Sequence, residues 1–135
     1  MKGWHIYIDG ASLGNPGQSG AGIVSYDEQG NEVWRESAHL GTMTNNMAEY
    51  EALVRALRKA REMAVVSVSV YTDSQLVANQ ILGLYRIRND RLRQYLLEAQ
   101  NLIGDFNSFE IRYIPREENR LADKLAKSAA AQQSG

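Results

Sequence analysis

The chain has 135 residues, the length of one ordinary domain, whose core is large enough for it to fold without disulfides or a structural metal. It contains no cysteine, which excludes disulfides, cysteine zinc sites and thiol nucleophiles and suits a reducing cytoplasm. The net charge of −1 argues against a protein that coats nucleic acid non-specifically, because such binding scales with the phosphates neutralised. No apolar stretch approaches the ~20 residues of a bilayer span, and the first residues do not resemble a signal peptide. We therefore expect a cytoplasmic protein without membrane contact.

The first part of the chain predicts an antiparallel meander followed by a helix. Strands are expected at 5–9, 21–26 and 32–39, with a long turn over 10–20 and a shorter one over 27–31. From Thr44 the apolar period becomes helical, with Met47, Tyr50, Val54 and Leu57 on one stripe.

The second part of the chain alternates strands with helices. We expect a strand at 65–71, helices at 74–82 and 89–103, a strand at 109–114, a last helix at 119–131 and a frayed tail at 132–135. Because helical crossovers favour right-handed βαβ units, the fourth and fifth strands should lie parallel to the first. The sequence thus predicts a single α/β domain over residues 1–135, in the order βββαβααβα.

Four acidic residues stand where this topology could gather them at one edge of the sheet. Asp9 ends the first expected strand and Asp73 the fourth, and open α/β sheets bind ligands at the carboxyl ends of neighbouring strands. Glu49 and Asp123 lie near the starts of the first and last helices, from which each could reach that edge. Because such a cluster repels itself, a divalent cation is its natural partner, and all-oxygen ligands select Mg²⁺ or Mn²⁺.

Each acid also has an ordinary structural explanation. Asp9 could form a turn with the following glycine, Asp73 could cap a helix, and Asp123 could pair with Lys127 one helical turn later. Glu49 could be solvated helix surface. Spacing alone therefore leaves both interpretations open.

Four motifs follow one another in the order found in the type 1 ribonucleases H, and the resemblance covers nearly the whole chain. They are Tyr7-Ile8-Asp9-Gly10-Ala11-Ser12 with Gly14-Asn15-Pro16-Gly17, Thr44-Asn45-Asn46-Met47-Ala48-Glu49, Tyr71-Thr72-Asp73-Ser74-Gln75, and Asn119-Arg120-Leu121-Ala122-Asp123. The chain is similar to the short form found in archaea and some bacteria, which lacks an extra basic helix and loop. The resemblance implies a ribonuclease H-like α/β fold, whose five-stranded mixed sheet has three antiparallel strands, then two parallel ones, and is flanked by helices.

The resemblance implies an endonuclease that hydrolyses the RNA strand of an RNA–DNA hybrid and leaves 5′-phosphate and 3′-hydroxyl ends. Asp9, Glu49, Asp73 and Asp123 would be its catalytic carboxylates and would hold two Mg²⁺ ions, with Mn²⁺ as a substitute. Double-stranded RNA is a second substrate to consider, and a monomer is expected.

Substrate contacts are expected around these acids. The 10–17 loop, with Gly10 and Ser12, offers close backbone approach to the wide minor groove of a hybrid, whose 2′-hydroxyls distinguish RNA from DNA. The resemblance marks Asn15, Asn45, Asn46 and Gln75 as groove contacts, and Thr44 and Asn89 as a pocket for a DNA-strand phosphate. Turn and helix-start chemistry would equally explain Asn15 and Asn45.

The chain departs from many members in the loop before the last helix. Those members carry a histidine there, whereas this loop is Pro115-Arg116-Glu117-Glu118. The resemblance to the short form suggests that Arg116 substitutes electrostatically, by holding the scissile phosphate or helping the product leave; Glu117 is a weaker candidate. His5 and His39, both on expected strands, are interpreted as structural or surface residues.

A basic cluster lies outside these motifs. Arg86, Arg88, Arg91 and Arg93, with Tyr85 and Tyr95 alongside, could grip a DNA backbone or could form a solvated helix face.

Two other classes of function compete with a nuclease. A binding module of the same fold would hold the hybrid without cutting it, but four carboxylates near phosphates would weaken its binding. A nucleotide-binding α/β protein would rest on glycines that do not fit G-x-G-x-x-G and that run into a strand rather than a helix.

Overall fold

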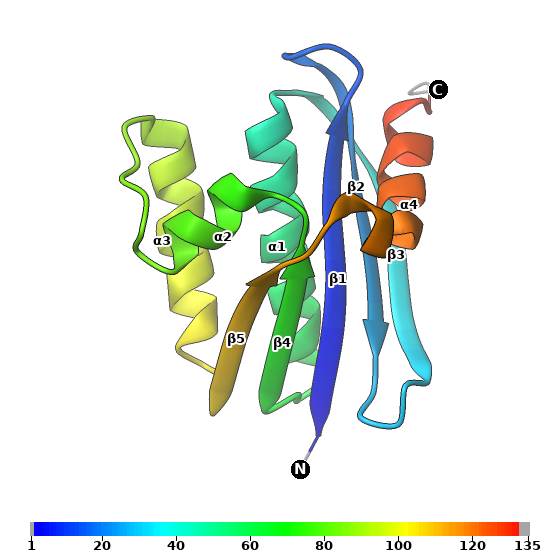
Figure 1. Cartoon of the computed structure of the whole chain (residues 1–135), viewed down its shortest axis with the longest axis vertical. Helices are drawn as coiled ribbons and strands as arrows, with labels where there is room; N and C mark the ends of the chain where they lie inside the picture. The colour runs from blue at the N-terminus through cyan, green and yellow to red at the C-terminus, as the bar shows by residue number, and fades with distance from the viewer. Residues whose placement is uncertain (1, 133–135) are drawn as a thin grey trace.

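The computed structural model describes residues 2–132, and within them five strands form one mixed sheet in the order β3-β2-β1-β4-β5 (Figure 1). The strands are β1 (Gly3–Ser12), β2 (Gly17–Tyr26), β3 (Glu32–Met43), β4 (Ser67–Thr72) and β5 (Ser108–Tyr113). The helices are α1 (Asn45–Glu62), α2 (Gln75–Ile81), α3 (Asp90–Ile103), α4 (Arg120–Ala130) and the short 3₁₀ turn η1 (Arg116–Glu118). β1 to β3 are antiparallel, and β4 and β5 run parallel to β1, so the expected fold class is confirmed.

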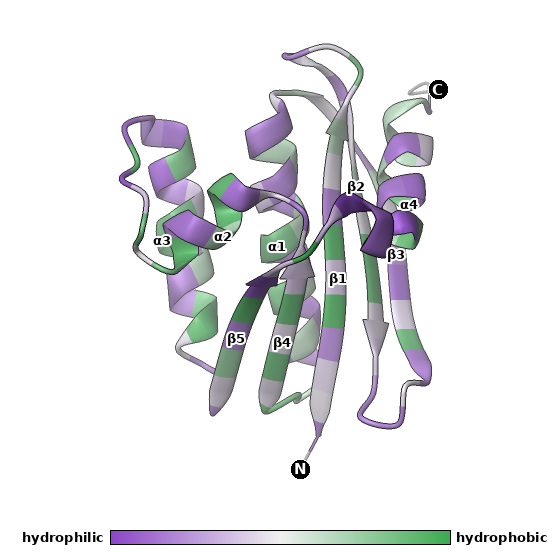
Figure 2. Cartoon of the chain, viewed as in Figure 1, coloured by the Kyte–Doolittle hydropathy of each residue, from purple (hydrophilic) through white to green (hydrophobic). Residues whose placement is uncertain are grey.

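The main core lies between the sheet and α1. Alternate residues of β1 and β4, including Ile6, Ile8 and Val70, are fully buried, as are Leu53 and Leu57 of α1. Figure 2 shows this alternation as green and pale bands along the two strands. Burial of the apolar faces is the main contribution to stability, at roughly 25 cal/mol per Å² of apolar surface. No helix within residues 2–132 is long and apolar enough to cross a bilayer.

The helices cover the two faces of the sheet unequally. In Figure 1, α1 lies behind the sheet and α3 packs against α1 at the left, beyond β5, whereas η1 and α4 lie on the front, near the upper end of the sheet and over β2 and β3. The lower part of the front face, over β1, β4 and β5, therefore carries none of the helices of residues 2–132.

Close backbone contacts bring α1 and α4 against the sheet. A Cβ at Gly10 would overlap the backbone of α1 between Ala48 and Glu49, and a Cβ at Gly22 would overlap the Ala122 carbonyl oxygen of α4. Gly20 meets α4 one turn further on. Only glycine permits such approach, which explains why the 10–22 segment is rich in it.

These contacts correct the expected long turn over 10–20. β1 continues to Ser12 and β2 begins at Gly17, so Asp9 lies within β1 rather than at its end. Glycines usually indicate a turn, but here most of them are paired strand residues under a helix. β3 likewise extends beyond the expected 32–39.

Side-chain caps explain where three helices begin. Thr44 accepts a hydrogen bond from the Met47 amide, Ser74 accepts one from Val77, and Asn89 accepts two at the start of α3. The last helix begins at Arg120, within one residue of the expected start. The Asn119 side chain makes no capping hydrogen bond there and instead donates to the Ile8 carbonyl inside the protein. Of the expected frayed tail, residues 133–135 lie outside the described residues.

We predict that Gly22→Ala lowers the free energy of unfolding by about 3 kcal/mol, because the added methyl group must displace the backbone of α4. Urea unfolding measures the change. The control is Gly104→Ala, where the new Cβ meets only ordinary contacts at the end of α3, so a change below about 0.5 kcal/mol is expected. Equal stability of the two variants would contradict the close packing of α4 on β2.

Candidate active site

Three carboxylates from three elements meet at the upper end of the sheet. In the parallel pairing of β1 with β4, Ile8 lies opposite Thr72, so the next residues, Asp9 within β1 and Asp73 directly after β4, are neighbours. Glu49 joins them from the first turns of α1, which Gly10 allows to approach. Each of the three residues offers an oxygen atom within 4.8 Å of the others.

Asp123 stands beside this triad but is held by two basic side chains. The Lys127 ammonium lies 3.1 Å from one carboxylate oxygen and the Arg116 guanidinium 3.6 Å from the other. All four acids line one cavity of about 480 Å³. The pairing of Asp123 with Lys127 and the clustering of the acids, which the sequence left as alternatives, therefore occur together.

Burial governs the electrostatics of the triad. Asp9 and Glu49 are 4% and 8% exposed, so Glu49 is not solvated helix surface. Burial, followed by the charge of Glu49, raises the pKa of Asp9 well above its usual range, and burial raises the pKa of Glu49 to about 7. Burial also raises the pKa of Asp73. Without a cation, the cluster therefore binds protons that the unfolded chain would release.

The donor set fits a hard divalent cation. Glu49 Oε2 is buried and has no hydrogen-bond partner among the described residues, a costly state for a carboxylate oxygen. A cation that binds carboxylate oxygens would satisfy it, and oxygen-only ligands suit Mg²⁺ or Mn²⁺. Asp73 does not cap α2, since Ser74 performs that role, so its carboxylate is available to such an ion.

The predicted substrate residues surround the cavity to different degrees. Gly10, Ser12, Asn45 and Asn46 line it, and the two asparagines are exposed. Asn15 accepts a hydrogen bond of 3.0 Å from the Asn45 amide and so fixes the 13–16 turn against α1. The other predicted contacts, Thr44, Gln75 and Asn89, are outside the cavity lining, and Thr44 and Asn89 are helix caps.

Two site residues were not identified from the sequence. Lys127 was considered only as an ordinary partner of Asp123, yet it lines the cavity. Asn119 is 2% exposed, donates a 2.8 Å hydrogen bond to the Ile8 carbonyl and lies close enough to Asp73 to oppose the rise in the pKa of that carboxyl. The sequence placed Asn119 at the start of the last helix, and no local pattern signals its burial.

The basic and histidine residues fall into separate groups. Arg116 is largely exposed at the cavity. His5 forms a hydrogen bond with Tyr71, and His39 forms one with the Ala129 carbonyl, so both histidines are structural, as expected.

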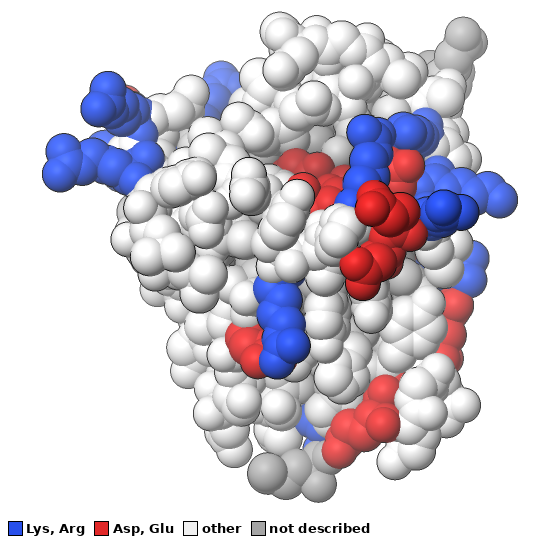
Figure 3. All heavy atoms as spheres, viewed as in Figure 1, with Lys and Arg blue, Asp and Glu red and all other residues white. Residues whose placement is uncertain are grey.

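Figure 3 shows mixed acidic and basic atoms over η1 and the start of α4, and basic atoms at the upper left over the loop between α2 and α3. All four arginines of the basic cluster are exposed, but Tyr95 is partly buried and donates to Glu51.

Comparisons with known proteins agree with this architecture. Residues 7–129 match the family model described as reverse transcriptase-like. Ribonuclease HI of Halobacterium salinarum is 38% identical over 93% of this chain, which spans 63% of that relative's length. The crystal structure of RNase H1 from the same archaeon has a TM-score of 0.91 at 37% identity, covering 94% of this chain and 96% of that one. LC11-RNase H1, solved in complex with an RNA/DNA hybrid, has a TM-score of 0.89 at 36% identity and covers 94% and 96%.

The fold and its acidic cavity thus define an α/β protein of the ribonuclease H-like class. Within that class, the chain belongs to the type 1 ribonuclease H family, as its four motifs indicated.

We predict that the metal-free protein loses stability as the pH rises from 4.5 to about 7. In this window the folded carboxyls retain protons that the unfolded chain has released, so the free energy of unfolding should fall by roughly 1 to 3 kcal/mol. Asp9→Asn removes a buried carboxyl whose ionisation is opposed by burial and by the charge of Glu49, so it should make the metal-free protein more stable at neutral pH. Urea unfolding in chelator measures both effects.

The control for this measurement is Asp105→Asn, which removes an exposed carboxylate paired with Arg61. It should leave the pH dependence unchanged. A metal-free wild type that gains stability across this window would contradict the raised pKa values of Asp9 and Glu49.

Proposed function

We propose that the protein is an endonuclease that hydrolyses the RNA strand of RNA–DNA hybrids with the help of bound Mg²⁺. The observation that carries this proposal is the triad of Asp9, Glu49 and Asp73, whose oxygens approach within 4.8 Å beside an open cavity. Further support comes from LC11-RNase H1, a relative of closely similar structure whose crystal contains an RNA/DNA hybrid.

The carboxylates divide into rigid and adjustable ligands for two ions. Asp9 lies within the central strand β1, which is paired on both sides, so it would be a rigid ligand for a bound cation. Glu49 and Asp73 would be the other ligands at the buried end of the cluster. Asp123, which forms ion pairs with Lys127 and Arg116, would be a ligand of the more weakly held ion. Two bound Mg²⁺ ions would activate water and stabilise the leaving 3′ oxygen, so that the products carry 5′-phosphate and 3′-hydroxyl ends.

Substrate choice is assigned to the polar rim of the cavity. Asn45 and Asn46 are exposed at the start of α1, and the backbone at Gly10 and Ser12 lies beside them. Such groups can donate and accept hydrogen bonds with the 2′-hydroxyls that line the minor groove of a hybrid. Asn15 supports this rim through its bond to the Asn45 amide, and Gln75 extends it at the start of α2.

Arg116 is proposed to act on the scissile phosphate. Its side chain is 67% exposed, and its guanidinium lies at the cavity beside Asp123. A guanidinium carries a permanent charge and cannot serve as a general base near neutral pH, so its contribution is electrostatic.

We predict that the wild type makes internal cuts in the RNA of an end-labelled hybrid only with Mg²⁺ or Mn²⁺. Asp73→Asn should lower this rate at least about 100-fold, because it removes a ligand charge from the triad. Asp105→Asn, which removes an exposed carboxylate far from the site, is the matched control and should cut normally.

Duplex DNA and duplex RNA are included as competing substrates. Cleavage that continues in chelator, or that survives Asp73→Asn, would refute the proposed mechanism. Tight hybrid binding without any cutting would instead favour a binding module of the same fold.

We predict that Arg116→Ala lowers kcat about tenfold, or about 1.4 kcal/mol, while changing the Kd for hybrid less than about threefold. Steady-state cleavage at saturating hybrid and hybrid binding in Ca²⁺ measure the two quantities separately. Arg112→Ala, which removes an exposed guanidinium from β5, is the control. An effect on affinity alone would assign Arg116 to binding rather than to turnover.

A further inference from the structure

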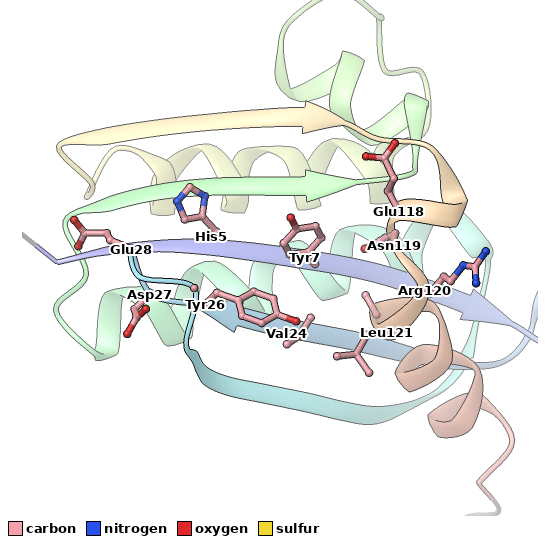
Figure 4. A pocket seen from close by; sticks show the side chains of 12 residues that line it. His5, Tyr7, Val24, Tyr26, Asp27, Glu28, Glu118, Asn119, Arg120 and Leu121 are labelled. Carbon is pink, nitrogen blue, oxygen red and sulfur yellow. The ribbon is translucent and has the colours of Figure 1, made fainter.

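A second cavity, of about 460 Å³, lies on the front face of the sheet at the edge of its helix-free part. Its floor is formed by β1 and β2, and its upper wall by the residues that connect η1 to α4 (Figure 4). This second cavity is not lined by any of the four acids of the candidate active site, Asp9, Glu49, Asp73 and Asp123. Its volume is in the range of small-molecule sites.

Aromatic rings form the floor of this cavity. Tyr7 and Tyr26 meet edge to face, with ring centroids 5.8 Å apart and planes at 86°. Tyr7 also stacks on Tyr71 at 4.7 Å, and His5 stacks on the same Tyr71 ring. The rings therefore make a continuous, partly exposed surface that attracts cations through their π faces and accepts methylene groups by apolar contact.

Acidic side chains stand at both ends of this aromatic floor. In Figure 4, Glu28 lies beyond His5 at one end and Glu118 lies above Tyr7 at the other. Asp27 adds a third carboxylate at the margin, while the one guanidinium of the lining, that of Arg120, points away from the rings. Among residues 2–132, these three carboxylates form no ion pair.

The spacing of the two terminal acids restricts the shape of the ligand. Glu28 accepts a hydrogen bond from the Gly3 amide and so lies near the start of β1. Glu118 lies close to Tyr7, because burial and the neighbouring tyrosines, together with the charge of Glu118, raise the pKa of the Tyr7 phenol. The extended strand between Gly3 and Tyr7 spans about 13 Å. Two positive groups joined by an aliphatic chain of comparable length would reach both carboxylates while the chain lies over the rings.

We propose that this cavity binds a linear aliphatic polyamine, with ammonium groups at Glu28 and Glu118 and the methylene chain on His5, Tyr7 and Tyr26. Nucleic acid phosphates are repelled by the same acidic rim, so this face is separate from the substrate surface. The assignment is independent of the proposed nuclease activity.

The test is a titration of the ¹⁵N-labelled full chain with spermidine, followed by amide chemical shifts at low salt. We expect shifts centred on residues 3–7, 26–28 and 118–120. Butylamine, which has one charge, should bind at least about fivefold more weakly, because it can satisfy only one carboxylate at a time.

Charge-neutral variants locate the site. Glu28→Gln and Glu118→Gln should each raise the spermidine Kd about threefold to fivefold. Glutamine at position 28 keeps an acceptor for the Gly3 amide, so the 27–31 turn is preserved. Glu110→Gln is the matched control, since it removes a carboxylate from the same sheet face outside the cavity lining and should change the Kd less than twofold.

Three results with the two amines and the variants would overturn the proposal. They are shifts centred on residues 9, 49 and 73, equal affinity for butylamine and spermidine, and an effect of Glu110→Gln as large as that of Glu118→Gln. Tighter binding by a short lysine-containing peptide than by spermidine would assign the face to a protein segment and would equally refute a polyamine site.

Discussion

Mutual repulsion among buried carboxylates is the constraint around which the upper end of the sheet is organised. Asp9 and Asp73 are adjacent because β1 and β4 are parallel neighbours in register, and neither strand can shift without breaking its ladder. Glu49 adds a third carboxylate, whose buried Oε2 has no hydrogen-bond partner within residues 2–132. The fold therefore holds a local arrangement that is unfavourable without a bound cation, as functional sites commonly do.

The rest of the fold supplies the stability that maintains this arrangement. Close approach at Gly10 sets α1 against β1, and close approach at Gly22 sets α4 against β2 on the opposite face. Acids carried by two strands and two helices can therefore share one cavity. The apolar core beneath, between α1 and the sheet, makes the positions of those elements nearly independent of the charges above them.

Asn119 links the two acidic regions of the front face. Its amide group donates a hydrogen bond to the carbonyl of Ile8, next to Asp9, and the residue also lines the cavity whose floor is formed by Tyr7 and Tyr26. The buried triad, made of oxygens alone, suits a small hydrated metal ion, whereas the aromatic floor with separated carboxylates suits a long organic cation. The two cation sites that we propose for this face differ in chemistry because the acids converge at one and stand apart at the other.

The order of elements, the parallel fourth and fifth strands and the four acids could be predicted from the residues, because periodicity and motifs are properties of neighbouring positions. The continuation of β1 and β2 through the glycines could not, since it depends on a helix about a hundred residues later. The burial of Asn119, the partners of Asp123 and the aromatic cavity likewise arise from contacts between distant segments. Such contacts are formed only when the whole sheet is assembled, and no local pattern encodes them.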